Sequence, residues 1–190
     1  MIVLVTGGAS SGKSAFAERV ACALPAPRVY LATMQGAGAE AAARIERHRA
    51  LRAGKGFDTV ECERELESSD ALARIPHDAT VLLEDLGNLA ANELFAPQPR
   101  TADAVLAGID ALVARCAHLV IVTNEIGSDG VGYDEGTRSY LEYLGALACA
   151  CAARADIVVE VTASLPQIVK RDQKGDAPLV PCLEEADVVC

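Results

Sequence analysis

The feature that most constrains this chain is a glycine-rich turn that follows directly after a short apolar run at the start of the sequence. The run spans Ile2–Thr6, and the turn reads Gly-Gly-Ala-Ser-Ser-Gly-Lys-Ser from Gly7 to Ser14. This spacing matches the P-loop pattern, in which backbone N–H groups surround a phosphate and the lysine reaches the terminal phosphates of a nucleotide. Glycines permit that backbone path, and the following helix directs its positive end at the phosphate. We therefore predict a strand, a phosphate-binding turn and a helix, with nucleotide contacts from Gly7, Gly8, Ala9, Ser10, Ser11, Gly12, Lys13 and Ser14.

Apolar runs and helical stripes alternate along the rest of the chain. Almost continuous Val, Ile and Leu are typical of strands buried on both faces of a parallel sheet. Such runs predict further strands at Arg28–Thr33, Thr80–Glu84, Leu119–Thr123 and Ile157–Thr162. Between the strands, apolar residues recur at helical spacing, as at Phe16, Val20 and Leu24. This order predicts an α/β fold with three layers, a mostly parallel central sheet and right-handed crossovers.

Three further features concern the organisation of the chain. Thr101 precedes an apolar stripe and is expected to cap the helix that the stripe predicts. The segment Asn124–Thr137 contains four glycines and is expected to form a mobile loop at the carboxyl end of a strand. The length suits a single core, so we predict one domain over residues 1–170 and an acidic tail over residues 171–190.

A strand-end acid is expected to complete the phosphate site. P-loop enzymes hold Mg²⁺ with the serine or threonine of the loop and an acid that follows a buried strand. The stretch Thr-Val-Leu-Leu-Glu-Asp supplies two such acids, Glu84 and Asp85. We predict that Ser14 and Glu84 bind the metal, although the sequence alone does not decide between the two acids, and an acid at this position also suits a helix cap.

Composition narrows the class of protein. The net charge is −10, which argues against a nucleic-acid partner, because neutralising phosphates drives that binding. The seven cysteines form no C-x-x-C pair, and with three histidines no zinc spacing emerges, so we interpret the cysteines as reduced structural thiols of a cytoplasmic protein. No apolar stretch is long enough to span a membrane, and we expect no signal peptide.

Basic residues gather around a single histidine. Five of the 17 lysines and arginines lie in a short segment that also holds His48, namely Arg44, Arg47, Arg49, Arg52 and Lys55. Taken alone, the segment suits a solvated basic helix with an incidental histidine. The alternative is a nucleophile: neighbouring guanidinium groups disfavour the imidazolium form, leaving a free lone pair, and stabilise charge on a phosphorus under attack. His48 and Lys13 are therefore the candidate catalytic residues.

The combined motifs resemble one enzyme family. The matching stretches are VTGGASSGKS, VYLATMQ, ARIERHRALR with FDTVE, LLEDLGNLAANELF, VIVTNEIG and ADIVVEV, in family order over about residues 1–171. They resemble the bifunctional adenosylcobinamide kinase / adenosylcobinamide-phosphate guanylyltransferase family of cobalamin biosynthesis. The resemblance implies that a nucleoside triphosphate, ATP or GTP, phosphorylates adenosylcobinamide. It further implies that GTP gives GMP to a histidine, which falls on His48, and that adenosylcobinamide phosphate accepts this GMP to form adenosylcobinamide-GDP.

The resemblance also implies an architecture and a set of contacts. Family members have a RecA-like P-loop NTPase fold and assemble as homotrimers with sites between subunits. Besides the P-loop, the family's nucleotide contacts fall on Thr33, Met34, Gln35, Arg49, Arg52, Glu61 and Glu84. The chain departs from the family pattern at Ser10, Phe57, Gly132, Leu141 and Ala148, which affects the expected corrinoid contacts more than the nucleotide chemistry.

Two other functions remain open at this stage. A plain small-molecule P-loop kinase would keep phosphoryl transfer and lack the guanylyl step. A nucleotide-dependent switch would need no arginine-flanked histidine, and guanine-reading switches usually carry an N-K-x-D motif, which the TNEIG stretch does not match.

Overall fold

The computed structural model describes residues 1–35, 54–67, 70–127 and 130–172. Within these residues a seven-stranded sheet has the order β3-β2-β4-β5-β1-β6-β7. The strands are β1 (Ile2–Thr6), β2 (Arg28–Ala32), β3 (Phe57–Glu61), β4 (Thr80–Glu84), β5 (His118–Val122), β6 (Ile157–Thr162) and β7 (Leu165–Arg171). All neighbouring strands are parallel except β7, which pairs antiparallel with β6. The expected α/β fold with a mostly parallel central sheet is confirmed.

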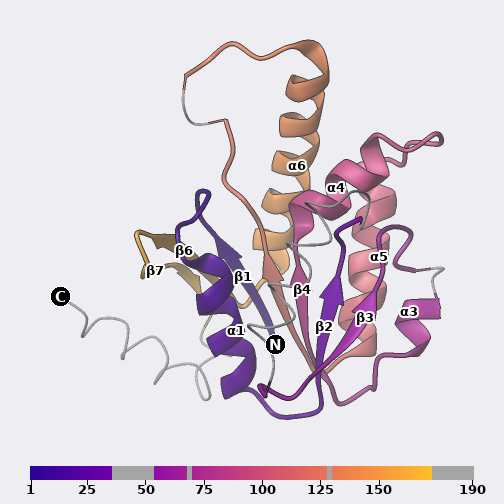
Figure 1. The fold of residues 1–190 in the computed structure, drawn as a ribbon, viewed down its shortest axis with the longest axis vertical. Coiled ribbons are helices and arrows are strands. Elements are labelled where there is room, and N and C mark those ends of the chain that lie inside the picture. The colour runs from indigo at the N-terminus through magenta and orange to yellow at the C-terminus, as the bar shows by residue number, and fades with distance from the viewer. Residues whose placement is uncertain (36–53, 68–69, 128–129, 173–190) are drawn as a thin grey trace.

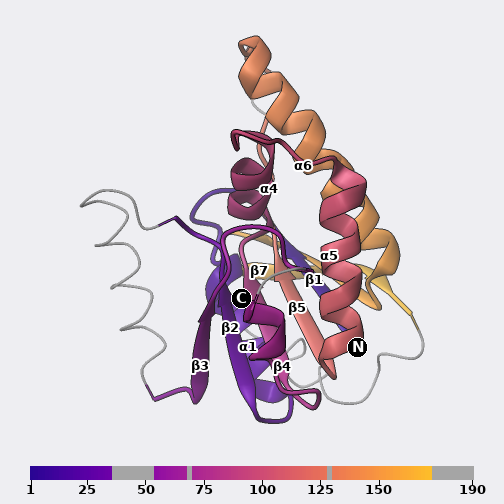
Figure 2. The same ribbon diagram turned by 90° about the vertical axis from the view of Figure 1, so that its right-hand side faces the viewer.

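Helices cover both faces of the sheet (Figures 1 and 2). They are α1 (Lys13–Ala23), α3 (Asp70–Ala73), α4 (Leu86–Leu94), α5 (Ala102–Arg115) and α6 (Glu135–Arg154). On one face, Phe16, Val20 and Leu24 pack against apolar side chains of the central strands. On the other face, α4, α5 and α6 contribute Leu89, Ile109 and other apolar residues to a second core cluster. These two cores give the three layers that the sequence predicts.

The structure differs from the sequence-based expectation at the two edges of the sheet. β3 and β7 were not predicted as strands, because neither is a continuous apolar run: β3 reads Phe-Asp-Thr-Val-Glu and most of β7 is exposed. The β6–β7 connection is a two-residue turn, and both Ala163 and Ser164 have positive φ angles of 50° and 66°. Glycine or asparagine usually marks such a turn, so the sequence lacked the expected signal.

Smaller differences concern element ends. The helix α6 begins at Glu135, inside the loop predicted for Asn124–Thr137, because the Asp134 side chain accepts a hydrogen bond from the Thr137 backbone N–H and caps the helix. Thr101 caps α5 as predicted, accepting from the Ala104 N–H. β7 continues to Arg171, residues 173–190 lie outside the described residues, and the domain boundary at residue 170 stays a prediction.

The described cysteines are free thiols: Cys22, Cys62, Cys116, Cys149 and Cys151. Burial raises the pKa of Cys151 to about 12 and that of Cys116 to about 11, so both stay protonated at neutral pH. These two residues therefore act as small apolar side chains, as the sequence predicts.

The strand order sets the position of the site. The carboxyl ends of parallel strands meet at one edge of the sheet, and β5 lies between β1 and β4. The glycine-rich turn leaves β1 at this edge, and Glu84 ends β4 at the same edge, one strand beyond β5. The topology thus brings together two motifs that are about 70 residues apart in the chain.

Candidate active site

The P-loop is built against the β6–β7 turn. Gly12 has a φ of +92°, and a Cβ added there would lie 2.7 Å from Ser164 Oγ and 3.2 Å from Ser164 Cα. At Gly7 an added Cβ would lie 2.4 Å from the Val161 carbonyl oxygen. The Ser164 N–H donates to the Ser11 carbonyl at 2.7 Å. Both glycines are therefore required by close approach to the β6–β7 hairpin, which the sequence analysis did not identify as part of the site.

Of the P-loop side chains predicted to contact phosphate and metal, Lys13 is buried and Ser14 is half-buried. Lys13 is 7% exposed, and its Nζ donates a hydrogen bond to the Gly8 carbonyl at 3.1 Å. Ser14 Oγ donates to Glu84 Oε1 at 2.5 Å, which links the start of α1 to the end of β4. This contact places the predicted pair, Ser14 and Glu84, side by side.

Glu84 has a strongly shifted pKa. Burial raises the pKa of its carboxyl group to about 7, the nearby Asp85 adds to the rise, and the hydrogen bond from Ser14 opposes it. Within the described part of the chain, Glu84 Oε2 is buried and has no hydrogen-bond partner. A buried carboxylate oxygen without a partner, beside a hydroxyl group, is suited to a cation ligand.

Asp85 has a different role. It caps α4: its Oδ1 accepts from the Asn88 backbone N–H at 2.6 Å, and its Oδ2 accepts from Asn124 Nδ2 at 3.0 Å. Both carboxylate oxygens are therefore engaged in holding the start of α4 and the segment after β5. Of the two acids that the sequence left open, Glu84 is the one in contact with the P-loop serine.

The remaining predicted nucleotide contacts lie at the ends of β2 and β3. Thr33 is fully buried, and its Oγ1 donates to the Asp85 carbonyl at 2.8 Å. Met34 is half-buried and Gln35 is exposed. Glu61 is exposed at the end of β3, which pairs with β2. The predicted catalytic His48 and the predicted contacts Arg49 and Arg52 lie outside the described residues.

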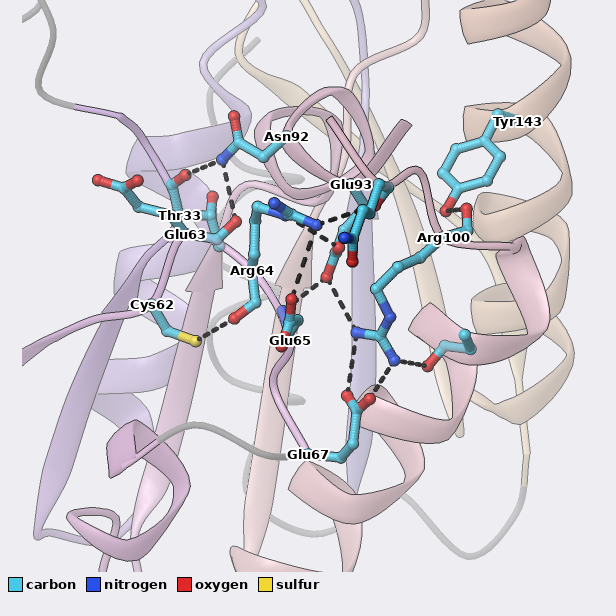
Figure 3. A network of polar contacts seen from close by, with 12 residues as sticks. Thr33, Cys62, Glu63, Arg64, Glu65, Glu67, Asn92, Glu93, Arg100 and Tyr143 are labelled. Carbon is cyan, nitrogen blue, oxygen red and sulfur yellow. Dashed lines mark hydrogen bonds and ion pairs between the residues drawn. The ribbon is translucent and has the colours of Figure 1, made fainter. Parts of the chain in front are cut away.

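A polar network beside these strand ends was missed by the sequence analysis (Figure 3). Asn92 Nδ2 donates to the Thr33 carbonyl at 2.7 Å and to the Glu63 carbonyl at 3.0 Å, so α4 holds the segments after β2 and β3 together. Glu93, 1% exposed, pairs with Arg64 and Arg100. The signal was the adjacent polar pair Asn92 and Glu93 near the end of a mostly apolar helix.

None of the described helices is long and apolar enough to cross a membrane. The described histidine, cysteine, aspartate and glutamate side chains form no group of three or more that could hold a metal ion.

Comparison with known proteins identifies relatives along nearly the whole chain. Residues 3–169 match the family model described as cobinamide kinase / cobinamide phosphate guanyltransferase. The bifunctional adenosylcobalamin biosynthesis protein CobU of Salmonella typhimurium is 36% identical over 185 residues, which cover 90% of this chain and all of that protein. The Escherichia coli protein of the same name is 34% identical over 90% of this chain and all of its own length. The corresponding CobP protein of Pseudomonas aeruginosa is 32% identical over 88% of this chain and 96% of its own length.

Solved structures resemble this chain in fold. An ATPase from the type III secretion system of pathogenic bacteria has a TM-score of 0.55 at 13% identity, covering 98% of this chain and 61% of the ATPase. A protein from Pyrococcus horikoshii OT3 has a TM-score of 0.51 at 11% identity, covering 93% of this chain and 89% of its own. At these identities the likeness concerns the fold alone, and it agrees with the expected P-loop NTPase architecture.

Proposed function

This chain belongs to the cobinamide kinase / cobinamide phosphate guanyltransferase family, and on that premise we propose that it catalyses both reactions on one scaffold. In the first, ATP or GTP phosphorylates adenosylcobinamide. In the second, GMP passes from GTP through His48 to adenosylcobinamide phosphate, which gives adenosylcobinamide-GDP. The observation that carries the proposal is the contact between Ser14 of the P-loop and Glu84 at the end of β4.

The kinase reaction uses positioning and charge. Catalysis of phosphoryl transfer consists mostly of holding the phosphates in line and stabilising their charge. The amides of the glycine-rich turn surround the inner phosphates, and Lys13 leaves the Gly8 carbonyl to reach the terminal ones. The buried setting of Lys13 strengthens this attraction, because charge interactions are weakly screened there.

The residues present fit a magnesium ion. Ser14 supplies a hydroxyl oxygen and Glu84 supplies a carboxylate whose Oε2 lacks a partner in the described part of the chain. Oxygen ligands of this kind suit Mg²⁺, which keeps several waters and takes few protein ligands. When bound, the ion would neutralise charge on the phosphates. Glu84 would bind it as the carboxylate, a form that the cation favours despite burial.

The guanylyl step requires a neutral imidazole. A nitrogen of His48 forms a bond to the α-phosphorus of GTP, and the bond to pyrophosphate breaks. A phosphate oxygen of the phosphorylated corrinoid then attacks the same phosphorus, and the nitrogen–phosphorus bond breaks to restore His48. Contacts to the nucleotide are proposed from Thr33, Met34, Gln35, Arg49, Arg52 and Glu61. Family membership and the basic setting of His48 in the sequence support this step.

Further aspects of the proposal concern the assembled protein. We propose a homotrimer with sites between subunits, in keeping with the family resemblance. A cytoplasmic location is proposed on the free thiols of the described cysteines, which suit a reducing compartment.

Isotope labelling tests the two reactions separately. After incubation with α-labelled GTP, we expect acid-labile, base-stable label on the protein, lost in His48→Ala and retained in the matched control His77→Ala. Transfer from γ-labelled nucleotide to adenosylcobinamide should persist in His48→Ala. If the wild-type protein takes no α-label, or if His48→Ala labels fully, the covalent step is wrong, and kinase activity alone would leave the plain small-molecule kinase.

A further inference from the structure

The side-chain amide of Asn92 joins two segments that hold proposed nucleotide contacts (Figure 3). Its Nδ2 donates to the Thr33 carbonyl at 2.7 Å and to the Glu63 carbonyl at 3.0 Å, and these two bonds form the Asn92 bridge. Thr33 begins the first group of proposed contacts, and Glu63 lies two residues after the proposed contact Glu61. Both N–H groups of the amide are therefore engaged by the backbone beside these contacts.

The bridge lies where the pairing of β2 with β3 ends. The last paired residues are Ala32 and Glu61, and the Cys62 N–H adds one bond to the Ala32 carbonyl at 2.9 Å. Beyond this point the Asn92 amide connects the two backbones in place of the strand ladder. Its bond to Glu63 is exposed, and water can satisfy an exposed carbonyl. Because asparagine is also a weak helix former, the stability of the fold alone does not explain asparagine at this position of α4.

Thr33 connects the bridge to the metal-binding acid. Thr33 is fully buried: its N–H donates to the Glu84 carbonyl at 3.3 Å, and its Oγ1 donates to the Asp85 carbonyl at 2.8 Å. Asp85 also caps α4, the helix that carries Asn92. The position of the segment after β2 relative to Glu84 is therefore set by α4.

Strand order separates these segments from the phosphate-binding turn. From β1 toward this edge of the sheet, the strands are β5, β4, β2 and β3. At a spacing of about 4.8 Å between strands, the end of β2 lies about 14 Å and the end of β3 about 19 Å from the end of β1. The backbone there is too distant to contact phosphates held by the glycine-rich turn, so contacts from these segments suit the nucleoside.

We propose that Asn92 is a positioning residue for the nucleoside end of the bound nucleoside triphosphate. The inference rests on the proposed function, which supplies the contacts after β2 and β3. The Asn92 bridge holds both segments in one arrangement before the ligand arrives, so binding does not have to order them. Without the bridge, binding of the nucleoside has to order the segments and the affinity falls, whereas phosphate binding at the glycine-rich turn is unaffected.

Asn92→Ala tests the inference with two ligands that differ in the nucleoside. We compare the affinity for the β,γ-imido analogue of GTP with that for inorganic tripolyphosphate. The analogue should bind about 5- to 30-fold more weakly, the size of two hydrogen bonds, while tripolyphosphate binding changes less than about twofold. In the kinase reaction, KM for GTP should rise by a similar factor and kcat should change less than about twofold, because the interaction lost is made equally before and in the transition state.

Thr80→Val is the matched control for stability. It removes one hydrogen bond from a side chain to a backbone carbonyl, from Thr80 Oγ1 to Pro25 at 2.8 Å, at the amino end of β4. Asn92→Ala and Thr80→Val should both lower the melting temperature of the nucleotide-free protein, by about 2–6 °C. Thr80→Val should leave both affinities and KM unchanged.

Four outcomes would overturn the inference: analogue binding by Asn92→Ala within twofold of wild type, an equal loss of analogue and tripolyphosphate, an equal loss of analogue affinity in Thr80→Val, or a fall in kcat at unchanged KM. If the wild-type protein binds the analogue in these cases, the inference fails and the proposed function stands. A wild-type protein that binds neither ligand would contradict both.

Discussion

Glu93 offers a stability test whose size follows from its contacts (Figure 3). The side chain is 1% exposed and accepts from the Glu65 N–H at 2.6 Å. Arg64 Nε lies 3.4 Å from Oε2 and Arg100 Nη1 lies 3.2 Å from Oε1. Glu93 in α4 is the shared acceptor for the segment after β3 and for Arg100, which precedes α5. We therefore expect Glu93→Ala to cause a large loss of stability.

The magnitude depends on the exposure of the partners. Breaking a buried ion pair by removing one member costs about 3–5 kcal/mol. The Arg64 and Arg100 side chains are 27% and 18% exposed and regain some water, so we take the lower end, about 3 kcal/mol. For a chain of this length, that corresponds to a fall in melting temperature of about 6–12 °C.

Thermal and urea unfolding of the nucleotide-free protein at pH 7 measure the effect. Glu142→Ala on the exposed side of α6 is the matched control, and its unfolding free energy should change by less than about 0.5 kcal/mol. In a double-mutant cycle, Arg64→Ala should cost less in the Glu93→Ala background than in the wild type. A melting temperature of Glu93→Ala within about 2 °C of wild type would refute the reasoning.

Three other predictions concern the site itself. Burial raises the pKa of Glu84 to about 7, so this group contributes stability below its unfolded value of 4.5, and that stability is lost as the pH rises through 7. The gain in unfolding free energy from Glu84→Gln should therefore grow by about 2–3 kcal/mol between pH 5 and pH 8. An equal gain at the two pH values would contradict this reasoning. Lys13→Ala should lower kinase kcat by about 100-fold or more with little change in melting temperature, and wild-type rates would place the triphosphate elsewhere. Gly12→Ala should abolish nucleotide binding and lower the melting temperature, because an added Cβ would collide with Ser164. Gly8→Ala should remain folded, because an added Cβ there meets nothing within 4 Å. Equal effects of the two substitutions would contradict the close packing of Gly12 on Ser164.

Short-range patterns in the sequence predicted much of the fold of this protein. The P-loop, the five central strands and the Thr101 cap could be predicted because each depends on residues close together in the chain. Glycines mark the turn where the backbone must approach a phosphate, unbroken apolar runs mark strands buried on both faces, and a hydroxyl residue precedes the helix that it caps. The same motifs in order also indicated the family, which the comparisons confirm. The contacts of His48, Arg49 and Arg52 remain predictions.

Tertiary structure decided what local pattern does not encode. The edge strands β3 and β7 owe their pairing to a neighbouring strand rather than to their own hydrophobicity, and the hairpin that ends at β7 supports the P-loop. Only the folded structure shows that Glu84 contacts Ser14 whereas Asp85 caps α4. The proximity of the P-loop to Glu84 depends on strand order, and strand order arises from packing between segments far apart in the sequence.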